Sequence, residues 1–367
     1  MKSNFPKGML MTALVTGTVL CSSAAAFAEE LQEYSLDQMV VTAQRTQKDD
    51  VDTPASVKVI TEKDLTQSGA TNLYDGLKLA NGITSYGYGA NGQAWGGMSA
   101  KILIRGNDKG TLVMIDGAPI NMNNVYFLNT LPVEAVERIE IVKGASSVLY
   151  GSEASSGVIN IITKKQMRNS ISLSKAEYGK TREGISLGLG KLGIVANLEQ
   201  GDELKGYASN GRAMNDGKKS SVMWKYKFDD KWTVSHQHTD NDYQFNQYDT
   251  ATWKTLKEDS SFKYKEDFAR IQYNDGSLKG NLYYNRSDRH NNTYKIKKGT
   301  ASKWKIEHIT FDTLGLDLQK EFNTKVADII VGTTLEQQTY KCDNPYSGGK
   351  LVNQKLDKDA KTYALFV

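Results

Sequence analysis

Two short stretches of the chain combine amide and aromatic side chains with glycines, and these residue types could bind a ligand. The first stretch lies within residues 86–97 and the second within residues 121–126. Their side chains are neutral, so they would hold a bulky, partly apolar ligand by hydrogen bonds and ring contacts. A solvated glycine-rich loop explains the same composition equally well. The candidate ligand-binding residues are Tyr86, Tyr88, Asn91, Gln93, Trp95, Asn121, Asn123, Asn124 and Tyr126.

Three glycines in the first stretch have the spacing of a dinucleotide-binding loop. Gly87, Gly89 and Gly92 match that spacing, but residues 93–97 contain further glycines and do not form a helical pattern. A phosphate group would therefore lack the helix N-terminus that such a loop requires. The sequence also shows no arrangement of a nucleophile and a base that supports catalysis. We therefore predict a protein that is not an enzyme and has no catalytic residues.

Two groups of side chains in the second half of the chain could bind a metal ion. His236 and His238 share one face of a predicted strand, but they continue an apolar and aromatic face, which favours a place at a membrane interface. Oxygen ligands at close spacing in a loop can bind Ca²⁺. The calcium candidates are Asp240, Asp242 and Asp249. Solvated carboxylates are far commoner than calcium sites, so these three are weak candidates, and no other cofactor is predicted.

The elements that must position the ligand stretches belong to one α+β domain, residues 53–168. A strand is predicted at Val57–Ile60, followed by a helix that starts at Thr61 with Asp64 in its first turn. A second helix is predicted from Thr71 or Asn72 to the stop signal Asn81-Gly82. Residues 136–165 then contain two β-branched runs around a glycine-rich turn cluster, which indicates strands joined by tight turns.

After residue 168 the chain alternates between apolar and polar residues. Val222, Trp224 and Tyr226 point one way, and Lys225 and Lys227 point the other. Tight turns are predicted at Lys191–Gly193, Asp229–Asp230, Asn274–Ser277 and Phe322–Lys325. Long polar loops are predicted at Glu203–Lys219, Asp242–Lys265, Asp288–Lys303 and Lys341–Ala360. Alternating short and long connections are typical of a transmembrane β-barrel, with about ten strands from Ser170 onward. A soluble β-sandwich is the less favoured alternative, because its turn signals would be more evenly spaced.

The N-terminal residues have the pattern of an export signal. Lys2 and Lys7 precede an apolar run and an Ala-Phe-Ala site, so residues 1–28 are predicted to be a signal peptide. Residues 29–52 are predicted to be a mobile arm. Its short apolar run at residues 37–43 is either a segment that docks by strand addition or an ordinary edge strand.

Composition excludes some classes of protein. The net charge is +4, without a clustered basic face, so nucleic-acid binding is not predicted. The mean hydropathy of -0.50 excludes a helical membrane protein. Removal of the signal peptide would leave Cys342 as the single cysteine, either a free thiol or one with a partner outside this sequence.

The stretches Ile102–Gly106, Leu112–Gly117 and Val136–Lys165 together resemble the plug domain of TonB-dependent outer-membrane receptors. The resemblance implies an α+β plug domain followed, at residues 169–367, by part of an antiparallel transmembrane barrel that has about 22 strands when complete. It also implies a Gram-negative outer-membrane protein that contacts outer-membrane lipid. By the same resemblance, Arg105 and Lys143 would latch the plug to barrel glutamates, with Lys143 the weaker partner because it replaces arginine.

The resemblance also implies the partners and the function. Its TonB box would be Asp37, Gln38, Met39, Val40, Val41, Thr42 and Ala43, and this segment would bind TonB and the inner-membrane energising complex. The two ligand stretches would be apical plug loops that contact cobalamin or a ferric siderophore. Haem is less favoured because the predicted plug domain contains no histidine. A passive barrel or surface adhesin without active transport is the alternative from another class of protein.

Overall fold

The computed structural model describes residues 40–41, 48–49, 56–70, 72–86, 101–107, 109–121, 128, 131–144, 154–175, 179–206, 209–213, 216–324 and 327–366. The predicted signal peptide and most of the predicted arm lie outside these residues. Within the arm, β1 (Val40–Val41) pairs antiparallel with β2 (Lys48–Asp49).

The plug domain is built on a five-stranded mixed sheet in the order β3-β8-β9-β6-β7. Its strands are β3 (Ser56–Thr61), β6 (Thr111–Ile115), β7 (Ala118–Pro119), β8 (Val136–Lys143) and β9 (Gly157–Thr163). Only β6 and β9 pair in parallel among these strands. At the start of β9, Gly157 has φ +153°, and a Cβ there would lie 2.4 Å from the Val142 carbonyl oxygen, so glycine is required. A separate pair consists of β4 (Ile83–Tyr86) and β5 (Lys101–Ile104).

Both predicted helices of the plug domain are confirmed at their start. The helix α2 (Glu62–Gln67) begins with a reciprocal capping box, in which Thr61 Oγ1 accepts from the Asp64 backbone and the Asp64 carboxylate accepts from the Thr61 backbone. The helix α3 (Leu73–Leu77) begins at the N-cap Asn72. It ends before the predicted stop at Gly82, because bonds from the Leu79 and Ala80 amides to the third carbonyl back tighten the chain into turns.

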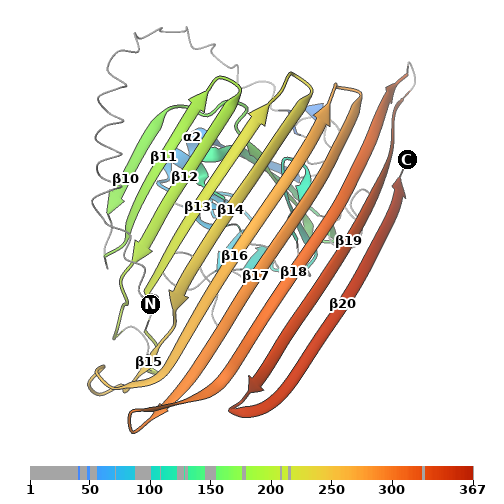
Figure 1. The fold of residues 1–367 in the computed structure, drawn as a ribbon. Helices are drawn as coiled ribbons and strands as arrows, with labels where there is room; N and C mark the ends of the chain where they lie inside the picture. The colour runs from blue at the N-terminus through green and yellow to red at the C-terminus, as the bar shows by residue number, and fades with distance from the viewer. Residues whose placement is uncertain are drawn as a thin grey trace. The chain divides into compact units, whose positions relative to one another are not determined.

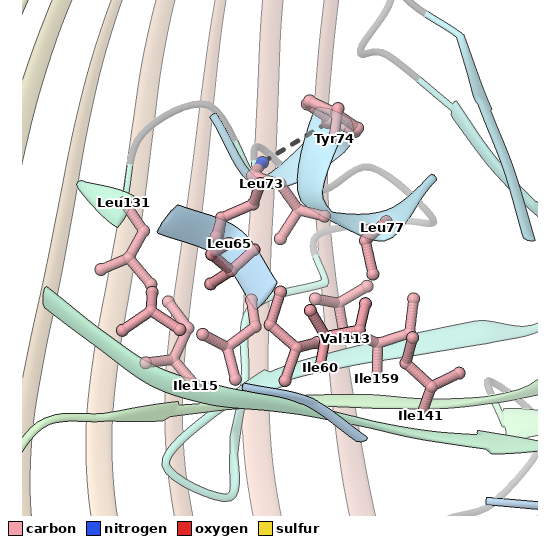
Figure 2. Packing of buried hydrophobic residues seen from close by; sticks show 14 of the residues in the cluster. Ile60, Leu65, Leu73, Tyr74, Leu77, Val113, Ile115, Leu131, Ile141 and Ile159 are labelled. Atoms are coloured by element: carbon pink, nitrogen blue, oxygen red, sulfur yellow. Dashed lines mark hydrogen bonds between the residues drawn. The ribbon is translucent and has the colours of Figure 1, made fainter. Parts of the chain in front are cut away.

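The plug core lies between the two helices and the mixed sheet (Figure 2). Leu65, Leu73 and Leu77 project from the helices toward Val113 and Ile159 on the sheet, and all five are at most 1% exposed. Burial of each such side chain contributes about 1.5–3 kcal/mol before entropy costs. This apolar contact holds the helices on the sheet and makes the plug domain a body with its own core.

The second part of the structure is one antiparallel sheet, called the wall below, in which each main strand pairs with the next along the chain (Figure 1). Its strands are β10 (Ser170–Lys175), β11 (Thr181–Leu189), β12 (Leu192–Gly201), β13 (Asp216–Lys227), β14 (Trp232–Gln244), β15 (Gln247–Tyr248), β16 (Leu256–Asn274), β17 (Leu278–Lys297), β18 (Thr300–Asn323), β19 (Asp328–Ser347) and β20 (Lys350–Phe366). The short strand β15 pairs only with β16 among them, so ten strands lie on the main path, as predicted. No helix in the described ranges is long and apolar enough to cross a membrane.

Two of the predicted long loops are wrong. The segments predicted as loops at residues 288–303 and 341–360 are strand, and the hairpins close through Lys298-Gly299 and Gly348-Gly349. The connection predicted at residues 242–265 is also shorter, because β14 continues to Gln244 and β16 starts at Leu256. These strand ends are polar on both faces, so they lack the alternation by which strands were recognised.

Candidate functional site: the interface between the plug domain and the wall

The two faces of the wall are distinguished by which residues reach the plug domain. On β17, Asn285 donates from Nδ2 to the Pro119 carbonyl oxygen of the plug domain at 2.9 Å. Asn285, Ser287 and Asn291 share that face and are buried. Residues at alternate positions, such as Leu282 and Tyr284, lie on the opposite face and are exposed. The plug-facing side of the wall is therefore polar, as expected for the inside of a membrane barrel.

Asp116 is the centre of the first set of contacts between the plug domain and the wall. It occupies the Asp116-Gly117 turn after β6, with φ +49°, a left-handed conformation that aspartate tolerates better than most residues. Its carboxylate accepts from the Thr163 backbone at 2.8 Å and hydroxyl at 2.5 Å. From the wall, Lys225 Nζ lies 3.3 Å from Asp116 Oδ2, and Gln272 Nε2 donates to the Asp116 carbonyl oxygen at 2.9 Å.

Glu134 is the centre of the second set. It lies in the short 3₁₀ helix η4 (Val133–Ala135), and its Oε2 is 2.6 Å from Arg182 Nη2 and 3.0 Å from Asn197 Nδ2 of the wall. Burial alone would raise the pKa of Glu134, but the Arg182 guanidinium and the Asn197 amide outweigh burial, so the pKa lies below its ordinary value of 4.5. The Glu134 carboxylate is therefore ionised at neutral pH and attracts the Arg182 guanidinium of the wall.

The lowered pKa of Glu134 predicts how this contact depends on pH. Because the pKa is lower when folded than when unfolded, the stabilisation is fully present above about pH 4.5 and is lost as pH falls through the folded-state pKa. We expect the urea concentration at which the plug domain unfolds, measured by hydrogen exchange, to fall as the pH falls through this acid range. A Glu134→Gln variant should lack this component of the pH dependence, and an unchanged pH profile in the variant would contradict the assignment.

A cavity of about 940 Å³ borders the Asp116 contacts. Asp116, Asn160 and Thr163 line it from the plug domain, and wall residues that include Lys225 and Gln272 line it from the other side. Such a volume is at the upper end of the usual range for small-molecule sites. Its lining is part polar and part apolar and includes several charged side chains, so it is not a closed apolar binding site.

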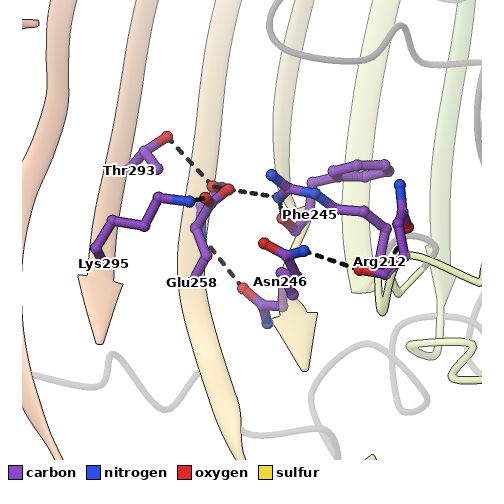
Figure 3. A network of polar contacts seen from close by, with 9 residues as sticks. Arg212, Phe245, Asn246, Glu258, Thr293 and Lys295 are labelled. Carbon is purple, nitrogen blue, oxygen red and sulfur yellow. Dashed lines mark hydrogen bonds and ion pairs between the residues drawn. The ribbon is translucent and has the colours of Figure 1, made fainter. Parts of the chain in front are cut away.

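A third polar network joins the connection between β12 and β13 to the wall (Figure 3). Glu258 on β16 is 4% exposed and forms ion pairs with Arg212, from the connection between β12 and β13, and with Lys295 on β17. Arg212 also donates to the Phe245 carbonyl oxygen, and Asn246 donates to Glu203 at 3.0 Å. The network anchors the loop to β16 and to the connection that follows β14, and loops held on a rigid scaffold commonly carry binding residues.

Most of the predicted ligand-binding and TonB-binding residues lie outside the described residues. These are Tyr88, Asn91, Gln93, Trp95, Asn123, Asn124 and Tyr126, together with Asp37, Gln38, Met39, Thr42 and Ala43. Tyr86 is described only as part of β4, and Val40 and Val41 only as β1. Their predicted contacts therefore stay predictions.

Asn121 has a structural role. Its side chain is 3% exposed, accepts from the Val113 amide at 2.8 Å and donates to the Thr111 carbonyl oxygen at 2.9 Å. Both polar atoms of its amide are thereby engaged with β6. Asn121 therefore supports β6, and its contact with a ligand stays a prediction.

The described ion pairs between the plug domain and the wall do not use the predicted latch residues. Lys143 donates to the Asn81 carbonyl oxygen inside the plug domain, and burial together with the charge of Arg105 lowers its pKa. Arg105 is exposed in the turn after β5, with φ +51°. Glu134 and Asp116 provide the described ionic contacts instead, with acids on the plug domain and bases on the wall.

The structure does not gather the three predicted calcium ligands. Asp242 forms an ion pair with Lys263 at 2.9 Å, and Asp249 accepts from Thr252 and from the Thr255 amide in its own loop. The Thr252 hydroxyl and backbone hold the pKa of Asp249 well below its usual range. No group of three metal-competent side chains in the described ranges includes Asp240, Asp242 or Asp249. Calcium binding there stays a prediction that this geometry does not support.

A known domain family and several known proteins match the sequence of the plug domain. The family model of the TonB-dependent Receptor Plug Domain matches residues 49–158. The vitamin B12 transporter BtuB of Vibrio cholerae serotype O1 is 33% identical over 250 residues, which cover 62% of this chain and 39% of that protein. BtuB of Vibrio vulnificus strain CMCP6 is 35% identical over 156 residues, or 42% of this chain and 24% of that protein. The chain thus spans less than half the length of these relatives.

Solved structures share the fold of both parts. The ferripyoverdine receptor of the Pseudomonas aeruginosa outer membrane matches with a TM-score of 0.62 at 16% identity, covering 89% of this chain and 51% of that one. A ferric enterobactin receptor of Pseudomonas aeruginosa matches with a TM-score of 0.58 at 17% identity, covering 89% and 56%. These likenesses confirm the fold class of a plug domain followed by antiparallel barrel strands.

Proposed function

Because the chain belongs to the TonB-dependent receptors of the Gram-negative outer membrane, we propose that it imports a scarce, bulky nutrient with energy from the inner membrane. TonB and its energising complex are the proposed partners. The reaction makes and breaks no bond in the nutrient, and relatives of this chain carry the names of transporters and receptors.

One observation carries this proposal: the contrast between the inside of the plug domain and its boundary with the wall. The plug core is apolar, and in the described residues its cluster reaches the wall strands only at Val195 and Met223. The other contacts with the wall are ion pairs and hydrogen bonds, which involve mainly Asp116 and Glu134. Water can replace polar contacts at modest net cost, whereas exposing an apolar core is expensive. Pulling would therefore rearrange the boundary before it unfolds the core.

Cobalamin is the first proposed ligand and a ferric siderophore the second. The curated relatives at 33% and 35% identity are named vitamin B12 transporters, and the solved structures of similar fold include receptors for ferric siderophores. Both ligands are bulky, and the neutral amide and aromatic residues predicted at the plug apices suit them. Contacts with either ligand remain part of the proposal.

Growth rescue separates the proposed ligands. We expect the protein to restore growth at limiting cobalamin to a strain that lacks its own cobalamin receptor. The same strain with iron supplied as a panel of ferric siderophores or as haem tests the other ligands. Rescue by one siderophore alone would transfer the proposal to that ligand. Rescue that persists without TonB would contradict energised import and favour a passive barrel.

A further inference from the structure

A cluster of three side chains lies on the face of the wall that points away from the plug domain. Asp288 and His290 alternate with the plug-facing residues Ser287, Arg289 and Asn291 on β17. His308 on β18 is the direct cross-strand partner of His290. Opposed residues in an antiparallel pair have Cβ atoms about 4.5–5.5 Å apart, so their side chains can bind the same ligand.

The ligand atoms of this cluster already have the spacing of a shared metal ion. Nε2 of His290 and Nε2 of His308 lie 3.3 and 3.0 Å from the same Asp288 Oδ1. All three atoms lie within 4.8 Å of one another. Two ligand atoms on a tetrahedral zinc ion, each about 2.0–2.1 Å from the metal, are about 3.3 Å apart. The distances between these ligand atoms are therefore close to those in a tetrahedral zinc site, and the backbone need not move.

The two imidazole rings are stacked, with centroids 4.0 Å apart and planes 13° apart. A metal ion lies in the ring plane of each imidazole that binds it, so the two rings must turn about their side-chain bonds before both Nε2 atoms can bind one ion. Basic side chains also face this cluster. Arg286 Nη2 lies 3.9 Å from Asp288 Oδ2, Arg286 Nη1 lies 3.1 Å from Asp312 Oδ1, and Lys265 on β16 is the cross-strand partner of Asp288. A metal ion would therefore share Asp288 with Arg286, which keeps Asp312 as a second partner.

Irregular strand pairing coincides with the cluster. The register between β18 and β19 shifts between Ile306 and His308, and the register between β17 and β18 shifts between Thr293 and Tyr294. Such bulges commonly re-aim side chains and interrupt the hydrogen-bond ladder. The β17–β18 ladder is continuous through Asp288, His290 and His308, so a metal ion bound there would reinforce an intact pairing next to these bulges.

We propose that Asp288, His290 and His308 form a binding site for one zinc ion that fastens the β17–β18 hairpin on the outer face of the wall. Two imidazoles and one carboxylate are ligands that zinc favours, and a water molecule completes four-coordination. The side chains of His290 and His308 are 50% and 44% exposed, which leaves that position open to solvent. Because the site faces away from the plug domain, the ion is structural and is not imported cargo.

A second histidine–aspartate cluster provides the control. His236 Nε2 and His238 Nδ1 lie 3.1 and 2.8 Å from Asp267 Oδ1 on the same outer face. Both histidines come from one strand and present different ring atoms. Among the described residues, only Asp288, His290 and His308 bring three ligand atoms within 4.8 Å of one another. Substitution in the Asp267 cluster therefore removes a similar histidine without removing a proposed ligand.

Zinc titration of the purified, tag-free protein after chelator treatment tests the site. We expect one zinc ion per chain and a weakening of roughly tenfold or more in His308→Gln and in His290→Gln, since loss of supporting residues alone weakens metal sites about 10–100-fold. His238→Gln should bind zinc as the unsubstituted protein does. Copper(II) bound in place of zinc should give an electron paramagnetic resonance signal of two nitrogen ligands, and of one in His308→Gln.

Two outcomes would overturn the zinc site. One is the absence of saturable zinc binding by a protein whose circular dichroism confirms the β fold. The other is an equal loss of binding in His238→Gln and His308→Gln, which would indicate non-specific surface histidines. Neither result bears on uptake, because the titration needs no TonB and no nutrient.

Discussion

Deletion of residues 37–43 is expected to abolish nutrient uptake and to leave nutrient binding intact. The outer membrane holds no ion gradient, and the sequence predicts no nucleotide site. The energy for the proposed import must therefore arrive through a segment that TonB binds. An extended segment docks through backbone hydrogen bonds and alternating side chains. The deletion removes the proposed TonB-binding segment and leaves the plug core unaltered. Uptake of labelled nutrient by cells, compared with binding to the same cells, measures the two effects separately.

A pair of substitutions at Val40 sharpens this test. Proline removes the backbone N–H and is poorly tolerated within paired strands, whereas threonine keeps the β-branched shape and the N–H. Val40→Pro should therefore reduce uptake strongly and Val40→Thr only slightly. In the structure Val40 pairs with Asp49, so docking on that edge must compete with β2, whereas docking on the other edge leaves the pair intact. Uptake that survives the full deletion would refute coupling through this segment.

Replacing Asp116 by asparagine should loosen the plug domain from the wall. Asparagine tolerates the left-handed φ of +49° and keeps one acceptor, so the turn itself survives. The substitution leaves Lys225, whose side chain is 13% exposed, without its described carboxylate partner. Because the pair lines the cavity and Lys225 keeps its bond to the Thr163 hydroxyl, the loss should cost about 1–3 kcal/mol. Hydrogen exchange of β6 and β9 should become faster by the corresponding factor.

A double-mutant cycle isolates this contact. Lys225→Met removes the other charge while preserving an apolar stem, so the double variant Asp116→Asn with Lys225→Met no longer contains an unpaired charge. We expect the double variant to be less destabilised than the sum of the single variants, with a coupling free energy of about 1–3 kcal/mol. Additive effects would show that the two side chains do not interact and would remove Asp116 as a centre of the boundary.

The local features of the plug domain were predictable because their signals are local. Thr61 and Asp64 form the capping box within three residues, and Asn72 caps α3 by accepting from the Asp75 backbone amide. The alternation from Val222 to Lys227 likewise predicted the wall. Strand ends such as residues 288–297 were taken for loops because no apolar face marks them. Their backbone pairs with β18, a tertiary effect that periodicity does not encode.

The boundary contacts were missed for a different reason. Asp116 and Lys225 are 109 positions apart in sequence, and neither residue type signals its partner. The one local signal was the Asp-Gly pair after an apolar strand, which predicts a turn but not what contacts it. Glu134 gave no signal beyond its place beside a buried strand. The buried role of Asn121 was hidden because a free amide and a fully hydrogen-bonded amide look alike in sequence.

The neighbour-to-neighbour pairing of the wall has a kinetic consequence. Several of its hairpins close through only a few residues, such as Lys298-Gly299 and Gly348-Gly349, so each new strand meets its partner after a short loop closure. In the plug sheet, by contrast, Ser56 must find Lys143. Contacts between distant residues slow folding. The wall is therefore suited to rapid growth one hairpin at a time, while completion of the plug sheet has to wait until the chain as far as β9 is available.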